Sequence, residues 1–279
     1  MKKLIIYTSI IIATVFFILL VQYGSKHSHG VPVEIKKAKT VLLEIPYLDS
    51  SVDLDKGIDL SFWDTRPATK VDFFYQIMVF PWPKATVPYV NIKTFHNKSD
   101  IYFYLEWPDD SEDSSLAIGA FTDSSAILFP IGEIKQTSSL MMGFLGKANI
   151  WHWKAIQNNE YWLNKKDETK VYVDFYYPFE EKELFPVSKD EAKSAVNDLM
   201  AIRVGTITPK PKQIVSGRGI YDKGLWKVVF KRTLKAEDET IDAKFSESKM
   251  LCAFAAWDGS KGDRGGRKSI SDWVELKLK

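Results

Sequence analysis

The chain of 279 residues contains a single cysteine, Cys252. One thiol cannot form an internal disulfide, attach a haem through C-x-x-C-H, or complete an iron–sulfur cluster or a zinc ribbon. The chain also lacks an excess of one charge, because 38 basic and 36 acidic side chains leave a formal net charge of +2. Nucleic acid is therefore not an expected partner. Any metal centre must take ligands other than thiolates.

The longest hydrophobic run lies at the N-terminus, where "MKKLIIYTSIIIATVFFILLVQYG" places Lys2 and Lys3 ahead of an apolar stretch from Leu4 to Val21. The run exceeds the roughly 7 to 15 residues of a signal-peptide core, and no A-x-A-like cleavage site follows it. It is long enough to span a bilayer. We expect residues 1–26 to be an uncleaved anchor, with a cleaved export signal as the alternative. Lysines on the cytoplasmic side would leave residues 27–279 outside, on the periplasmic side, as one domain.

The rest of the chain is rich in short β-prone runs separated by Pro, Gly, Asp and Asn. The clearest pair is Tyr89–Phe95 and Ile101–Trp107, which "HNKSD" joins as a hairpin. Aromatic residues make up 14% of the chain and favour strands. The pattern predicts a mainly β fold, an antiparallel β-sandwich with one or a few short helices.

One stretch predicts a helix instead. "SKDEAKSAVNDLMA", residues 188–201, begins with Ser188 and Glu191 in capping-box spacing. Its apolar side chains then recur at helical spacing on one face. These side chains are Ala192, Ala195, Val196, Leu199 and Met200.

The acidic stretch "DDSEDSS", residues 109–115, has oxygen ligands that could suit calcium. Charge runs of this kind are more often solvated. We therefore expect a solvated loop rather than a calcium site.

The C-terminal loop "WDGSKGDRGGRKS", residues 257–269, is unusually rich in glycine and charge. It resembles a phosphate-binding loop, but Arg267 separates Gly266 from Lys268, and the following "SISDWVELKLK" predicts a strand rather than a helix. A nucleotide site is therefore not expected. The residues alone leave Lys268 as either a solvated turn residue or a placed amine.

Three segments occur together in one order: "SAILFP" (125–130), "LMMGFLGKANIWHWKA" (140–155) and "FAAWDGSKGDRGGRKSISDW" (254–273). Together they resemble the haem b-binding γ subunits of the ethylbenzene dehydrogenase group, which are partners of type II dimethyl sulfoxide reductase-like molybdenum enzymes. "VDFFYQ", "IYFYLEWPDDSED" and "GLWKVVFKRTL" follow the order of the same family.

The resemblance implies one non-covalent haem b with two axial ligands from the protein, Met142 and Lys268. It also places Gly143, Trp153 and Trp257 at the cofactor. In this chemistry a neutral thioether raises the haem potential, and the lysine must lose its proton to bind iron.

Two alternatives for the ligands stay open. Met141 stands beside Met142, so a shift of one residue would exchange their roles. His152 is the only histidine within a predicted strand and is the reserve ligand. On a strand, Trp151 and Trp153 share one face and His152 takes the other.

A haem with both axial positions filled by protein carries electrons and has no site for substrate. The resemblance thus implies a non-catalytic electron-transfer subunit, which relays electrons between a molybdopterin catalytic subunit with its iron–sulfur subunit and an external partner such as a cytochrome c. The alternatives are an exported β-sandwich that binds sugars or other planar ligands on its aromatic side chains, and a membrane-docking scaffold without haem.

Overall fold

A computed structural model describes residues 40–76, 84–115, 119–132, 145–164, 194–203, 205–245 and 250–279. All of them belong to a compact unit, Thr40–Lys279, while Met1–Lys39 form a separate unit. The predicted anchor, Met141, Met142 and Gly143 lie outside the described residues. Within the described ranges, none of the helices is long and apolar enough to cross a membrane.

One sheet has five strands, and every neighbouring pair in it is antiparallel. The hairpin predicted around "HNKSD" is confirmed, because its two strands pair from Asn91↔Glu106 to His96↔Ile101. In spatial order the strands are β10 (Ser216–Asp222), β11 (Leu225–Thr233), β5 (Asp100–Pro108), β4 (Tyr89–His96) and β2 (Thr69–Asp72).

The second sheet has nine strands. Its spatial order is β1 (Val41–Ile45), β14 (Val274–Leu278), β12 (Met250–Trp257), β6 (Ser124–Ile131), β7 (Leu145–Lys154), β8 (Val196–Arg203) and β9 (Thr208–Pro209). β13 (Ser269–Ile270) pairs with β12 and with β3 (Phe74–Tyr75).

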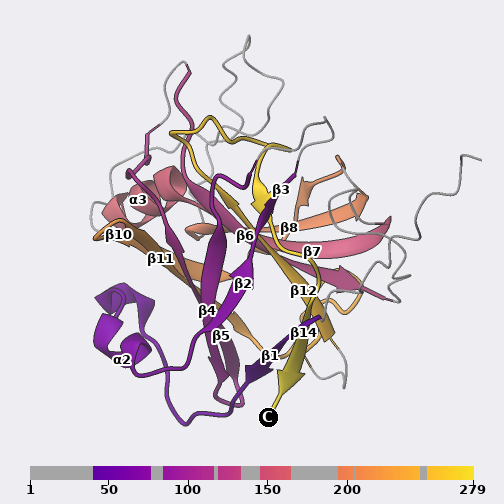
Figure 1. The fold of residues 1–279 in the computed structure, drawn as a ribbon. Coiled ribbons are helices and arrows are strands. Elements are labelled where there is room, and N and C mark those ends of the chain that lie inside the picture. The colour runs from indigo at the N-terminus through magenta and orange to yellow at the C-terminus, as the bar shows by residue number, and fades with distance from the viewer. Residues whose placement is uncertain are drawn as a thin grey trace, which may run out of the picture. The chain divides into compact units, whose positions relative to one another are not determined.

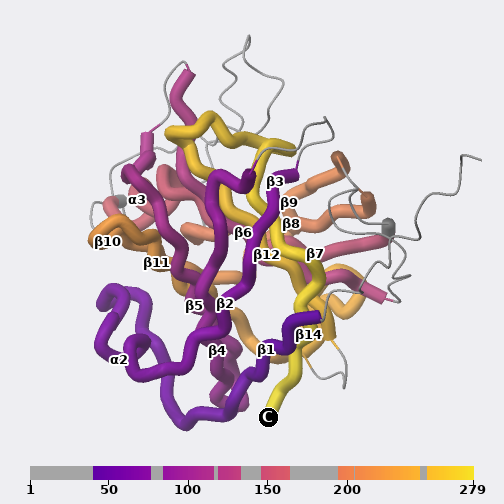
Figure 2. The backbone as a smooth tube through the Cα atoms, viewed as in Figure 1, coloured from indigo at the N-terminus to yellow at the C-terminus, as the bar shows by residue number. Residues whose placement is uncertain are grey.

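The expectation of antiparallel pairing fails at one edge of this sheet, where β1 and β14 run parallel. Leu43 pairs with Leu276 there, and both side chains are buried. Figure 2 shows the indigo strand β1 beside the yellow strand β14. The strands of a parallel pair are not joined by a tight turn, so no hairpin pattern in the sequence could predict this pairing.

The two sheets share one core (Figure 1). Aromatic rings from both sheets meet in it: the Phe103 ring lies 5.8 Å from that of Trp151, and the Trp153 ring lies 5.0 Å from that of Trp226. Alternate residues of the long strands point into this core, such as Phe103 and Leu105 on β5 and Trp151 and Trp153 on β7, as period-two patterning requires. The prediction of a mainly β fold with few short helices is thereby confirmed.

The described helices are η1 (Leu54–Lys56), α2 (Leu60–Asp64) and α3 (Ala155–Asn164). Asp59 caps α2 by accepting a hydrogen bond from the Phe62 amide at 3.2 Å. Trp63 of α2 is buried and stacks 4.9 Å from Tyr104 on β5. The segment that carries η1 and α2 therefore covers the outer face of the five-stranded sheet.

The predicted helix over residues 188–201 is wrong in the part that the structure describes. Val196–Arg203 form strand β8, in which Val196 pairs with Trp153 and Leu199 pairs with Ile150. Pairing with β7 buries Val196 and Leu199, a gain that outweighs the weak helical preference of the sequence.

Candidate functional site

The central strands of the nine-stranded sheet present different side chains on their two faces. Ile127, Trp151 and Phe254 lie in the core shared with the other sheet. Ala126 pairs with both His152 and Ala255, and directly opposed residues share a face, so these three side chains point to the outer side.

The outer face of this sheet is apolar and made of small side chains near its middle. Ala253 and Ile270 are buried there outside the main core, with Phe74, Ala255 and Trp273 packed against them. The patch is apolar, and Ala253 and Ala255 contribute only small side chains to it. An apolar face of this kind can receive a planar apolar ligand.

Trp257 ends strand β12 at one edge of this face, and the C-terminal loop returns to it. The loop turns through Gly265 and Gly266, where Arg264 and Arg267 exchange both backbone hydrogen bonds, at 3.0 and 2.8 Å. Gly265 has φ of 52°, in the region that favours glycine. The turn therefore folds Lys268 back beside Trp257.

The Lys268 side chain is held against this tryptophan. Its Nζ lies 5.3 Å from the centroid of the Trp257 ring and donates to the Gly265 carbonyl at 3.3 Å. The Trp257 indole donates to the same carbonyl at 3.1 Å. On the backbone side, the Lys268 carbonyl accepts from the Gln76 amide at 2.8 Å. The strand pair β3–β13 thus fixes the position of the lysine.

The Asp263 carboxylate holds the same loop in place through hydrogen bonds. It is buried and accepts hydrogen bonds from the hydroxyls of Tyr75 at 2.7 Å and Thr86 at 2.5 Å. Its second oxygen also accepts from the Asp258 amide at 3.2 Å. The loop is therefore held in place by a buried carboxylate, while Arg264–Arg267 at its turn are exposed.

The electrostatic surroundings favour a neutral Lys268 amine. Burial lowers the pKa of Lys268 to about 8, and Asp263 acts in the opposite direction. None of the described carboxylates lies within ion-pair distance of its Nζ. An amine placed in this way can lose its proton near neutral pH, as iron ligation requires.

His152 is a second nitrogen donor at the same place. Its ring lies 5.1 Å from that of Trp257, and its Nε2 is buried without a hydrogen-bond partner among the described residues. Burial, with smaller contributions from Lys154 and Lys268, holds the pKa of His152 well below its usual range. The imidazole is therefore neutral and has an unused nitrogen.

The side chains gathered here are of the kinds that a haem pocket needs. Two nitrogen donors, the neutral His152 imidazole and the Lys268 amine with its lowered pKa, lie beside the Trp257 indole at the edge of an apolar face, and none of the described carboxylates pairs with either. The fit can be tested only for Lys268 and its neighbours, because Met142 and Gly143 lie outside the described residues.

Lys268 and Trp257 lie together in the structure, and His152 lies beside them. Trp153, which the resemblance placed at the cofactor, does not lie with these three residues. Trp153 is buried between the sheets, on the face opposite His152, and its indole donates to Asn158 at 3.1 Å. The alternation of Trp151, His152 and Trp153 signalled this division. It did not show which face belongs to the core.

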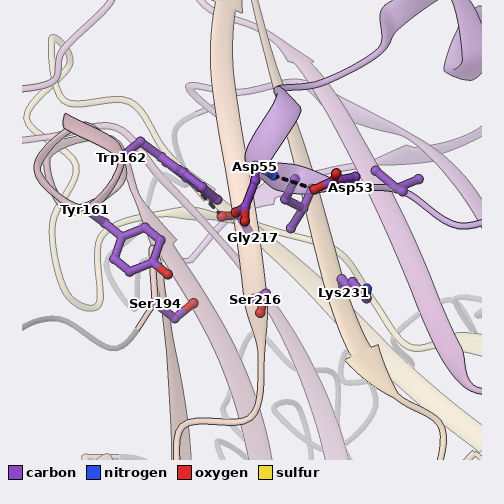
Figure 3. Close-up of a pocket in the computed structure, with 10 residues that line it drawn as sticks. Asp53, Asp55, Tyr161, Trp162, Ser194, Ser216, Gly217 and Lys231 are labelled. Atoms are coloured by element: carbon purple, nitrogen blue, oxygen red, sulfur yellow. Dashed lines mark hydrogen bonds between the residues drawn. The ribbon is translucent and has the colours of Figure 1, made fainter. Parts of the chain in front are cut away.

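A separate pocket of about 210 Å³ lies between the η1 segment, α3 and β10 (Figure 3). Trp162 donates to the Gly217 carbonyl in it at 3.3 Å, and the Arg218 guanidinium lies 4.4 Å from the Trp162 ring centroid. Those predicted cofactor residues that the structure describes, Trp153, Trp257 and Lys268, do not line this pocket. Because an arginine already lies over one face of Trp162, the pocket gives little support to stacking on a sugar.

Comparison with known proteins identifies relatives along most of the chain. A respiratory nitrate reductase heme subunit, provisionally so named, of Haloferax mediterranei is 22% identical over 77% of this chain and 65% of its own length. The chlorate reductase subunit gamma of Ideonella dechloratans is 22% identical, over 64% of this chain and 60% of the relative. The dimethylsulfide dehydrogenase subunit gamma of Rhodovulum sulfidophilum is 26% identical, over 63% and 56%. The chain thus spans about two thirds or less of these relatives.

Solved structures show only a distant likeness. A carbohydrate-binding module of family 9 from Caldicellulosiruptor kristjanssonii, in complex with cellotriose, has a TM-score of 0.43 and 9% identity over 85% of this chain and 93% of its own. This likeness is too weak to indicate a ligand. The sequence profile described as ethylbenzene dehydrogenase, in contrast, matches residues 60–269, three quarters of the chain. The chain therefore belongs to the ethylbenzene dehydrogenase family.

Proposed function

We propose that this chain is an electron-transfer subunit that holds one non-covalent haem b, with Lys268 and Met142 as its axial ligands. The observation that carries the proposal is the Lys268 amine, with its pKa lowered to about 8, held beside Trp257 at the edge of an apolar face. Membership of the ethylbenzene dehydrogenase family supports it, as does a relative named as a heme subunit.

When bound, haem b supplies a one-electron carrier. The residues of this chain bind it, orient it and keep water away. The Gly265–Gly266 turn and the Gln76 contact hold the backbone of Lys268, so little side-chain freedom is lost on ligation. Trp257 shields one side of the lysine from water, and burial lowers the pKa of its amine. A methionine thioether opposite would favour ferrous iron and raise the potential.

His152 is the second candidate ligand, and a specific observation favours it. Its Nε2 is buried, unpartnered among the described residues and neutral at pH 7. It is a conventional haem ligand and lies near Lys268. A histidine in place of methionine would give a lower haem potential, so the two assignments are distinguishable.

The proposed partners are a molybdopterin catalytic subunit with its iron–sulfur subunit on one side and a cytochrome c-type protein on the other. The names of two relatives, subunits gamma of a reductase and a dehydrogenase, support a place in such a complex. We further propose that residues 1–26 anchor the chain and that the rest lies on the periplasmic side. A chain whose axial sites are both filled would leave catalysis to the partner.

The test is the visible spectrum of the purified full-length chain, oxidised and then reduced with dithionite, with a pyridine extract to identify the haem. A sharp low-spin reduced spectrum with extractable haem b would support the proposal. A protein that stays colourless after reconstitution with haem would overturn it, and would favour the ligand-binding or docking alternatives.

A further inference from the structure

Four carboxylates gather at one end of the described strands, at the start of the C-terminal loop. Asp109 follows β5, Asp123 precedes β6, Asp258 follows β12, and Asp113 lies in the loop between the first two. One oxygen of each lies within 4.8 Å of the corresponding oxygens of the other three. Asp109, Asp123 and Asp258 are 5%, 0% and 3% exposed.

Hydrogen bonds position these carboxylates. Asp123 accepts from the Gly259 amide at 2.8 Å, from the Asp113 amide at 2.7 Å and from the Trp226 indole at 2.9 Å. Asp258 Oδ1 accepts from the Ser260 hydroxyl at 2.7 Å and the Lys261 amide at 3.0 Å. The cluster is therefore preorganised by backbone and side-chain donors.

One oxygen in the cluster has no partner in the part of the chain that the structure describes. Asp109 Oδ1 accepts from the Ser111 amide at 3.2 Å, but Asp109 Oδ2 is buried without a hydrogen-bond partner among those residues. A buried carboxylate oxygen left unpaired is costly, since it loses its hydration without compensation. Native structures rarely keep such an atom unless a water or an ion satisfies it.

Local cations do not balance the negative charge. Lys261 is the nearest described one, and its Nζ lies 3.9 Å from Asp258 Oδ2 and 3.0 Å from the exposed Asp110. Its side chain is 45% exposed, so it sits at the rim and leaves the buried carboxylates facing one another.

We propose that Asp109, Asp113, Asp123 and Asp258 form a binding site for one calcium ion. The ligands are all oxygens, which suit a hard cation, and calcium accepts the irregular geometry that several carboxylates from different segments impose. The loop expected to be solvated is therefore only partly so: Asp110 and Glu112 are exposed, whereas Asp109 is buried in the cluster.

The ion would join the two sheets. β5 belongs to the five-stranded sheet, whereas β6 and β12 belong to the nine-stranded sheet. Asp258 also lies at the start of the C-terminal loop, and Asp263 holds the same loop through hydrogen bonds. Calcium would therefore stabilise the loop at its first residue, whether or not the chain holds a haem.

Terbium is a direct probe, because Tb³⁺ replaces Ca²⁺ and emits when a nearby tryptophan absorbs. The full-length chain is stripped with EGTA, returned to chelator-free buffer and titrated with Tb³⁺. Trp226 donates to Asp123, so we expect saturable emission with one ion per chain. Ca²⁺ should displace the Tb³⁺ at concentrations at least tenfold below those needed for Mg²⁺.

Two variants and one control locate the site. Asp109→Asn and Asp258→Asn should each weaken Tb³⁺ binding at least tenfold. Glu112→Gln removes the same charge from an exposed position of the same loop and should change the affinity less than twofold. In EGTA, the two Asn variants should melt at or above the temperature of the unchanged protein, because they relieve repulsion. In Ca²⁺ they should melt below it.

The titration of the unchanged protein decides the matter even if a variant fails to fold. No saturable emission, together with no calcium-dependent rise in melting temperature, would overturn the proposal. Equal displacement by Mg²⁺ would contradict the assignment to calcium, and unchanged affinity in both variants would place the ion elsewhere. Haem content does not enter these measurements, so their failure is distinct from failure of the electron-transfer proposal.

Discussion

The side-chain nitrogen of Lys268 lies 5.3 Å from the ring centroid of Trp257, and both side chains donate to the Gly265 carbonyl. This arrangement leaves the lysine half-buried at the end of a loop that could have left it fully solvated.

Replacement of Lys268 by Ala should convert a low-spin haem spectrum to a five-coordinate or water-ligated one, because one axial nitrogen is lost. Lys277→Ala is the matched control, since Lys277 is exposed on β14. The measurement is the absorption spectrum of both variants, oxidised and reduced. An unchanged low-spin spectrum in Lys268→Ala would remove this lysine from the ligand set.

Replacement of Met142 by Leu should lower the midpoint potential of the haem, because a thioether stabilises ferrous iron. Redox titration of Met142→Leu, Met141→Leu and His152→Leu separates the three candidates for the second ligand. A change confined to Met141→Leu would move the ligand by one position. A loss of the low-spin form only in His152→Leu would assign the role to the histidine.

The haem affinity of the haem-free protein should depend on pH through Lys268. Ligation needs the neutral amine, and the pKa of Lys268 is lowered to about 8. Affinity should therefore fall about tenfold for each pH unit below 8 and level off above it. His152 stays neutral in this range and adds no slope above pH 7. In Lys268→Met, haem titrations at several pH values should show no such slope.

In the turn after Trp257, Gly259 leaves no room for a side chain. A Cβ at this position would lie 2.0 Å from the Phe121 carbonyl oxygen, which is backbone and cannot move aside. Gly259→Ala should lower the free energy of unfolding by about 1–3 kcal/mol. Gly266→Ala is the control, because its Cβ would meet nothing within 4 Å. Urea unfolding of both variants tests the difference, and equal stability would contradict it.

A buried ion network lies elsewhere in the protein, where Lys210 contacts Asp198 and Asp242. These three residues are 4%, 0% and 1% exposed. Lys210→Met should cost about 3–5 kcal/mol of stability, because it leaves two carboxylates buried without their cation. Lys212→Met removes an exposed pair with Glu237 and should cost less than about 1 kcal/mol. Similar melting temperatures for the two variants would show that the buried network contributes little.

The sequence was sufficient for the strands whose signals are local. The hairpin of β4 and β5 follows from alternating side chains around a polar turn. The segment over Val196–Arg203 shows where local reasoning stops. Its apolar residues fit helical spacing as well as a strand, and only pairing with β7 decided between the two.

For the candidate site, the sequence marked individual residues through a family resemblance, namely Lys268 and Trp257, with His152 in reserve. The sequence did not show that these three side chains lie together. Their proximity depends on the turn at Gly265 and on which face of β7 meets the other sheet.

The four carboxylates of the acidic cluster also come together only in the folded chain. Asp109 and Asp258 are far apart in the chain, and only the packing of the two sheets brings their oxygens within 4.8 Å. Composition and periodicity determine which segments become strands, because those preferences act over a few residues. The tertiary structure alone decides which buried charges face one another, because long-range strand pairing sets that proximity.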